Sequence, residues 1–126
     1  MNPSDQARQV GVVDSWLSQV EDVDNAINPA ASTVLATTGA LAAGYYDVFY
    51  GASFSAALAY YNLVFYHQNA ADSAVLWGDY FIAAAAGGFR NALKNVKLAA
   101  NERFKFVCES AYTGQITTWI IAIRRA

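Results

Sequence analysis

The side chains best suited to chemistry in this sequence are the basic ones of its last third. Arg90, Lys94 and Lys97 stand at i, i+4 and i+7, so on a helix all three would project from one face. Arg103 and Lys105 follow closely after them. Such a row of cations can neutralise phosphates without reading bases. The solvated face of a helix whose other side is packed would give the same row, so both interpretations stay open.

The charge of the chain is divided between its two ends. Residues 1–25 carry five acidic side chains and one basic side chain, a net charge of −4. Residues 90–126 carry seven basic and two acidic side chains, a net charge of +5. The overall net charge of −2 conceals this polarity, which favours a polyanionic partner for the basic end.

No group of residues has the composition of a catalytic or metal site. His67 is the only histidine, and the residues after it are Gln68 and Asn69, so neither a nucleophile–base pair nor a set of metal ligands is evident. Cys108 is the only cysteine, which excludes an intrachain disulfide. The sequence therefore predicts that the protein is not an enzyme and has no metal, no cofactor and no small-molecule substrate.

An apolar stretch, residues 28–66, dominates the organisation of the chain, and Asp47 is the one charge within it. A helix that is apolar on every side is buried on every side, and 126 residues supply too little other protein to surround it. Charged residues make up 14% of the chain, against about 25% in typical globular proteins. The composition therefore predicts a large self-association interface or a bilayer environment.

The predicted fold class is all-α, in a single domain that covers residues 1–126. Val13, Trp16, Val20 and Val23 recur at helical spacing, and Asn28-Pro29 is typical of the start of a helix. We expect an antiparallel bundle of about four long Ala/Tyr-rich helices, arranged as bent hairpins that pack against neighbouring subunits. Their approximate bounds are 4–27, 29–68, 73–99 and 102–125.

Small residues recur every four positions in the second predicted helix, and aromatic residues surround them. Small residues at this spacing let two backbones approach closely, although an ordinary Ala-rich helix explains the pattern about as well. The predicted subunit interface consists of Ser32, Ala36, Ala40, Gly44, Tyr45, Tyr46, Phe49, Tyr50, Gly51, Ser55, Ala59 and Tyr60.

The short chain, its richness in Ala and Tyr, the lack of a disulfide and the basic end resemble the major virion proteins of filamentous, rod-shaped and bacilliform archaeal viruses. The resemblance implies a small all-helical capsid protein that assembles, helically and in many copies, into a virion shell around double-stranded DNA. It implies assembly in the host cytoplasm and DNA contacts without sequence specificity. The DNA-facing residues that it implies are Arg90, Lys94, Lys97, Arg103, Lys105, Arg124 and Arg125.

Two alternative functions remain open. A small integral membrane protein with two or more transmembrane helices is one, because 22 uncharged residues separate Asp24 from Asp47 and 24 separate Asp47 from Asp72. Both windows reach the ~20 residues that a helical span requires, but polar residues such as Asn62 dilute them. The other is a soluble helical bundle that binds a partner helix or an apolar ligand, which would leave the charge polarity without a purpose.

Overall fold

The computed structural model describes residues 17–126, which form strands and turns and contain no helix. The predicted all-α bundle is therefore wrong, and so is the resemblance to all-helical virion proteins. The part of the first predicted helix that precedes residue 17 lies outside the described residues. Residues 17–126 hold no helix with the length and apolarity to span a bilayer. The strands are β1 (Ser18–Ile27), β2 (Thr33–Thr37), β3 (Gly44–Phe54), β4 (Val64–Gln68), β5 (Val75–Tyr80), β6 (Gly87–Leu98), β7 (Arg103–Cys108) and β8 (Gln115–Arg124).

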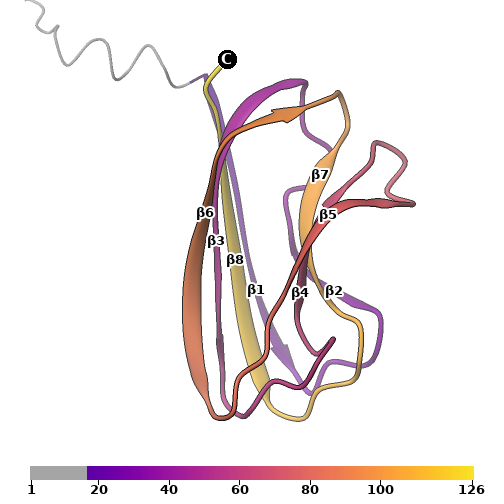
Figure 1. Ribbon diagram of the computed structural model, residues 1–126, viewed down its shortest axis with the longest axis vertical. Coiled ribbons are helices and arrows are strands. Elements are labelled where there is room, and N and C mark those ends of the chain that lie inside the picture. The colour runs from indigo at the N-terminus through magenta and orange to yellow at the C-terminus, as the bar shows by residue number, and fades with distance from the viewer. Residues whose placement is uncertain (1–16) are drawn as a thin grey trace, which may run out of the picture.

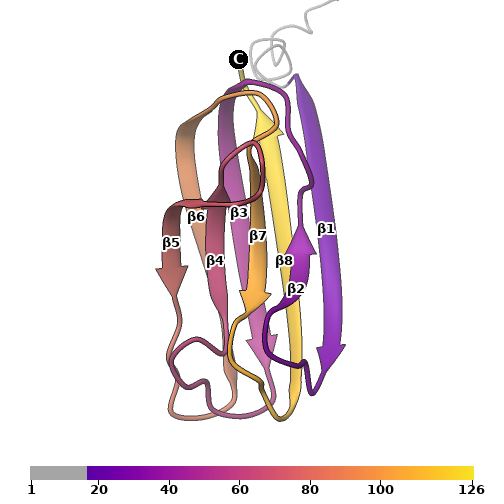
Figure 2. The same cartoon turned by 90° about the vertical axis from the view of Figure 1, so that its right-hand side faces the viewer.

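Two antiparallel four-stranded sheets pack face to face, with the strand orders β1-β8-β3-β6 and β2-β7-β4-β5 (Figures 1 and 2). Pairing joins β1 with β8, β2 with β7, β3 with β6 and β4 with β5, so the second half of the chain runs back along the first. Eight strands paired in this way form a jelly roll, a double-sheet architecture built from two Greek keys.

Aromatic rings fill the core between the sheets. Tyr50 of β3 stacks on Phe65 of β4, with ring centroids 3.8 Å apart, and Phe104 and Phe106 of β7 pack against the same Phe65 ring. The Tyr50 hydroxyl donates a hydrogen bond of 3.2 Å to Oδ2 of Asp79. Burial, followed by the negative charge of Asp79, raises the pKa of Tyr50 to about 12. The phenol therefore stays a neutral donor at physiological pH.

The helical interpretation failed because the strands are apolar on both faces. Along β3, the inward-facing Tyr46, Val48 and Tyr50 alternate with the outward-facing Tyr45 and Phe49. Side chains alternate faces in a strand, but here the outward set contains Tyr45 and Phe49 as well as Asp47 and Ser53, so no clean polar–apolar alternation is visible. A helix buried on all sides and a strand buried on both faces then give the same hydrophobicity pattern.

The residues directly before the helices predicted at 29–68, 73–99 and 102–125 lie in turns. Asn28, Asp72 and Asn101 have φ angles of 48°, 57° and 71°. Asn and Asp tolerate this left-handed region better than other non-glycine residues, which makes them frequent in turns as well as at helix starts. The predicted junctions between helices are therefore turns of the β fold: Asn28 begins the segment between β1 and β2, Asp72 lies between β4 and β5, and Asn101 lies between β6 and β7.

Candidate functional site

The outer face of the β1-β8-β3-β6 sheet is the most distinctive surface of the described chain. Residues directly opposite one another on neighbouring strands share a face. The register places Val23, Trp119, Gly51 and Arg90 in one row across all four strands. Val23 is 68% exposed, and Ile27, two pleats along the same strand, is 75% exposed.

The next row of this face is apolar over β8, β3 and β6. Ile121 pairs with Phe49 and Phe49 with Ala92, while Glu21 stands opposite Ile121 on β1. Ile121 and Phe49 are partly exposed and Ala92 is exposed. Contiguous apolar surface of this kind marks an interaction site more often than scattered single residues do. The outer face is therefore suited to contact another protein surface.

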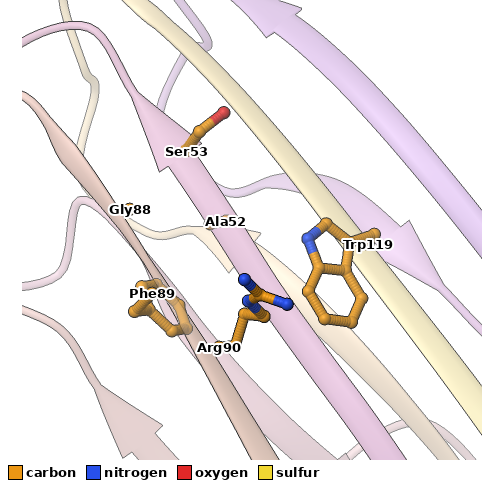
Figure 3. A pocket seen from close by; sticks show the side chains of 6 residues that line it. All are labelled: Ala52, Ser53, Gly88, Phe89, Arg90 and Trp119. Atoms are coloured by element: carbon orange, nitrogen blue, oxygen red, sulfur yellow. The ribbon is translucent and has the colours of Figure 1, made fainter.

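An open hollow of about 630 Å³ lies over β3 in the middle of this face, lined by Trp119, Arg90 and Ser53 among others. Figure 3 shows Arg90 and Trp119 reaching over β3 from its two neighbouring strands. A Cβ atom at Gly51 would overlap Cζ2 of Trp119 and would lie 2.5 Å from the carbonyl oxygen of Phe89. Glycine at this position therefore lets the indole approach the backbone and leaves room beside it.

The two edge strands of this sheet carry opposite charges. β1 contains Glu21, Asp22 and Asp24 and no basic residue, whereas all charged residues of β6 are basic. Glu21 lies on the outer face, while the alternation of the strand places Asp22 and Asp24 on the inner side, where Asp22 accepts a hydrogen bond of 2.9 Å from the Thr37 amide. Burial, together with the negative charge of Asp22, raises the pKa of Asp24 above its ordinary value. The charge polarity seen along the sequence thus becomes a polarity across one sheet, from an acidic edge to a basic edge.

Asp47 sits between the basic groups at the β6 end of the face. Its carboxylate accepts hydrogen bonds of 3.0 Å from the Asn95 amide and from Nε of Arg125, and it lies 3.9 Å from Nζ of Lys94. Burial would raise the pKa of Asp47, but the Asn95 hydrogen bond and the two positive charges outweigh it and hold the pKa below its ordinary value. Lys94 also lies 4.5 Å from the centroid of the Phe49 ring.

The seven residues predicted to contact DNA fall into three groups. Arg90, Lys94 and Lys97 project from the outer face of β6, because a bulge opposite Tyr46–Val48 restores Lys97 to that face. Arg103 and Lys105 belong to β7 in the other sheet, and Arg124 and Arg125 lie at the end of β8. The structure therefore brings the first three together and separates them from the β7 pair.

The β7 pair already has partners within the subunit. Nη2 of Arg103 donates to the Ala70 carbonyl at 3.2 Å, and Nζ of Lys105 lies 3.1 Å from Oδ1 of Asp72. These two cations stabilise the segment between β4 and β5.

The residues predicted to form the subunit interface are also divided. Ala36, Tyr46 and Tyr50 are buried in the core of the subunit. Tyr45 and Phe49 lie partly exposed on the outer face of β3, and Gly51 of the same strand is buried against the Trp119 indole. Gly44 is partly buried at the start of β3. The exposed members in loops and turns are Ser32, Ala40, Ser55, Ala59 and Tyr60.

Sequence reasoning missed Val23, Ile27 and Trp119 as surface residues. The helical spacing of Val20 and Val23 concealed the outward position of Val23 and of Ile27. With a period of two, residues 18–27 place both on one side of a strand, opposite Val20 and Ala26. That alternation was the signal available in the sequence.

His67 has an acidic partner that its neighbours in the sequence did not reveal. Its Nε2 lies 2.9 Å from Oε1 of Glu102, at the far end of the β6–β7 turn. Within residues 17–126, no group of three or more side chains is placed to hold a metal ion. The His67–Glu102 pair joins β4 to the turn between β6 and β7.

Comparisons with known proteins identify the fold and leave the family open. No protein-family model and no curated protein matches the chain. Among solved structures, the globular domain of zebrafish complement 1qA aligns with a TM-score of 0.56 and 8% identity, over 86% of this chain and 96% of that one. The likeness extends to the fold alone.

Weaker structural likenesses include two binding or structural domains. The PRD1 vertex protein P5 aligns with a TM-score of 0.47 and 12% identity, over 88% of this chain and 99% of that one. A carbohydrate-binding module of lichenase 5A from Cellvibrio mixtus aligns with a TM-score of 0.44 and 14% identity, over 90% and 93%. Neither likeness identifies a ligand or a partner for this chain.

Proposed function

We propose that the protein is a structural subunit that assembles with copies of itself through the outer face of the β1-β8-β3-β6 sheet, as part of a virion shell. In this contact, the acidic β1 edge of one copy lies against the basic β6 edge of another. The observation that carries the proposal is an apolar face bounded by edge strands of opposite charge.

The apolar part of the face supplies the driving force for association. Val23 and Ile27 project from an edge strand at 68% and 75% exposure, and Trp119, Ile121 and Phe49 continue the surface inward. Burying such side chains is favourable by about 25 cal/mol per Å² of apolar area. The hollow beside Trp119 offers a recess for a projecting side chain of the second copy.

The charges supply the orientation of the contact. β1 against β1 would bring Glu21 of one copy toward Glu21 of the other, and β6 against β6 would bring Arg90, Lys94 and Lys97 toward their counterparts. Like charges that face each other across an interface are unfavourable and exclude the wrong arrangement. Placing β1 against β6 pairs the two signs, and it can produce a two-fold pair of subunits, a closed ring or an open helical filament.

Charge reversal tests this orientation. We expect Glu21→Lys and Lys97→Glu each to weaken self-association about fivefold or more, because an attractive pair becomes a repulsive one. The double variant on one chain restores opposite charges at the contact and should recover most of the affinity. Sedimentation equilibrium over a concentration series measures the effect. Ala71→Glu, an exposed position between β4 and β5, is the control for a change of charge alone.

Two results would refute the orientation or the association itself. A double variant weaker than either single variant would exclude the β1–β6 contact. A wild-type chain that remains monomeric throughout the concentration series would exclude self-assembly.

Enclosure of double-stranded DNA is a second candidate, favoured by the row of exposed cations on the outer face of β6. Changing Lys94 and Lys97 to Gln should flatten the salt dependence of DNA binding, since each lost phosphate contact lowers the slope. A native particle denser than protein alone, isolated without detergent, would support packaged nucleic acid. The double variant Glu21→Lys, Lys97→Glu separates the two candidate functions. It should recover self-assembly, but it should not recover the phosphate contact that Lys97 makes in the DNA-binding hypothesis.

A further inference from the structure

A second hollow, of about 500 Å³, lies on the far sheet and is lined by Tyr61, Tyr66, Tyr80, Glu109 and Ser110. Tyr80 stands nearly perpendicular to Tyr66, with an interplanar angle of 88° and ring centroids 6.4 Å apart. Tyr61 lies 5.4 Å from Tyr80 at an angle of 63°. Three aromatic walls at steep angles and one carboxylate therefore meet around one open space.

The turn that presents Tyr61 is held firmly in an unusual conformation. Tyr61 has a φ angle of 69°, which is rare for a bulky residue. Its carbonyl oxygen accepts hydrogen bonds from the amides of both Glu109 and Ser110, at 3.0 and 2.9 Å. The Asn62 side chain, 7% exposed, donates to the carbonyls of Ser110 and Ala111. Backbone strain maintained by the surrounding structure is frequent at ligand-binding sites.

The polar groups of the hollow favour a positively charged ligand. The Tyr66 hydroxyl donates a hydrogen bond of 2.8 Å to Oε2 of Glu109. Burial, followed by this bond and the charge of Glu109, raises the pKa of Tyr66, so the phenol keeps its proton. No Lys or Arg is among the residues that line the space. The hollow thus combines electron-rich rings with one carboxylate that no basic lining residue neutralises.

We propose that this hollow binds a quaternary (trimethylated) ammonium group. Aromatic rings attract cations through their faces, and walls of several rings recognise quaternary ammonium ions. A primary ammonium would need acceptors for three N–H groups, whereas Glu109 already accepts from Tyr66 and the other walls are ring surfaces. A quaternary ammonium has no N–H group and needs none of these acceptors, and its methyl groups can contact the ring surfaces. The inference is independent of the proposed self-assembly, which uses the opposite sheet.

Titration with choline tests the site. We expect binding with a dissociation constant on the order of millimolar, since a few cation–π contacts supply the affinity. Chemical shift changes in the NMR spectrum should map to Tyr61, Tyr66 and Tyr80. The neutral isostere 3,3-dimethylbutan-1-ol has the same shape without the charge, and it should bind at least about fivefold more weakly. Equal binding of both compounds, or of neither, would overturn the proposal.

Matched variants localise the effect. Tyr80→Leu should weaken choline binding about fivefold or more, and Tyr80→Phe should retain most of it, because the ring face is kept. Trp77→Leu is the control, since Trp77 is also on β5 with 42% exposure against 43% for Tyr80, but it does not line the hollow. If Trp77→Leu and Tyr80→Leu weaken binding equally, the assignment to this hollow is wrong.

A vesicle arm distinguishes free choline from a lipid headgroup as the source of the cation. Vesicles of phosphatidylcholine should bind the protein in competition with free choline if the headgroup reaches the same hollow. Vesicle binding that choline does not displace would place the membrane contact elsewhere and count against the proposed site.

Discussion

The apolar edge of β1 gives the sharpest test of the proposed assembly. Val23→Thr and Ile27→Thr keep a β-branched side chain, which preserves the strand, but remove apolar surface. Fully burying a Val or Ile side chain contributes about 1.5–3 kcal/mol. Exposures of 68% and 75% in the free subunit leave most of that contribution available on association. Each substitution should therefore cost about 1–2 kcal/mol of association free energy.

Together the two substitutions should weaken self-association by about 2–4 kcal/mol, or roughly 30- to 700-fold in the dissociation constant. The assay is sedimentation equilibrium of the wild-type and double-variant chains. Because both side chains are exposed in the free subunit, the free energy of unfolding of dilute protein should change by less than about 0.5 kcal/mol per site. Denaturant unfolding at low concentration measures that second quantity.

Ile82→Thr is the matched control for this experiment. Ile82 is 70% exposed and lies between β5 and β6, away from the β1 edge. It should leave the dissociation constant unchanged. The reasoning is refuted if Ile82→Thr weakens association as much as Ile27→Thr does, or if the double variant associates as tightly as the wild type.

Three further predictions concern stability. Asp24→Asn should raise the free energy of unfolding at pH 7 by up to about 1 kcal/mol. The pKa of Asp24 is raised in the folded state, so its ionised form destabilises the fold. The gain should therefore disappear as the pH falls below the pKa of this carboxyl in the unfolded chain. Asp47→Asn should lower the free energy of unfolding at pH 7, because the pKa of Asp47 is lowered in the folded state. The stability that ionised Asp47 contributes is present above its unfolded-state pKa and is lost as the pH falls through its folded-state pKa. Thermal unfolding at several pH values measures the effects of both substitutions. Gly51→Ala should lower the free energy of unfolding by about 1–3 kcal/mol, since the new Cβ would collide with Trp119 and with the Phe89 carbonyl. Adding Trp119→Ala in the same chain should recover only the part of this loss that the collision with the indole causes. A full recovery would show that the Phe89 carbonyl adjusts without cost.

The sequence predicted the position of the basic surface residues better than it predicted the fold class. The alternation Arg103-Phe104-Lys105-Phe106 in β7 is a plain strand signal. The two residues before it, Asn101-Glu102, have the composition of a helix start but form a turn, with Asn101 at φ 71°. In β8, Ile120 faces the core while Ile121 faces outward, so alternation was invisible there. Local patterns could not decide between the two folds.

The basic row was predicted to share one face, and it does so for a different reason. Arg90, Lys94 and Lys97 would share a helix face by their spacing, whereas on a regular strand Lys97 would point to the opposite side. The bulge in β6 opposite Tyr46–Val48 inserts one residue and corrects the phase. A bulge depends on pairing with a strand 48 residues away, at Asp47 and Asn95, which no local pattern in residues 90–97 could supply.

The position of β8 determines how the chain can fold. β8 lies between β1 and β3, and within residues 17–126 it is the strand that joins β1 to its sheet. Only β4 and β5 pair as near neighbours in sequence, so the other pairings must close long loops first, which slows folding. During synthesis, β1 therefore remains without its partner until residues 115–124 have left the ribosome. Until then the nascent chain exposes the apolar Val23 and Ile27. The neighbouring charges of Glu21, Asp22 and Asp24 oppose aggregation of this unpaired strand.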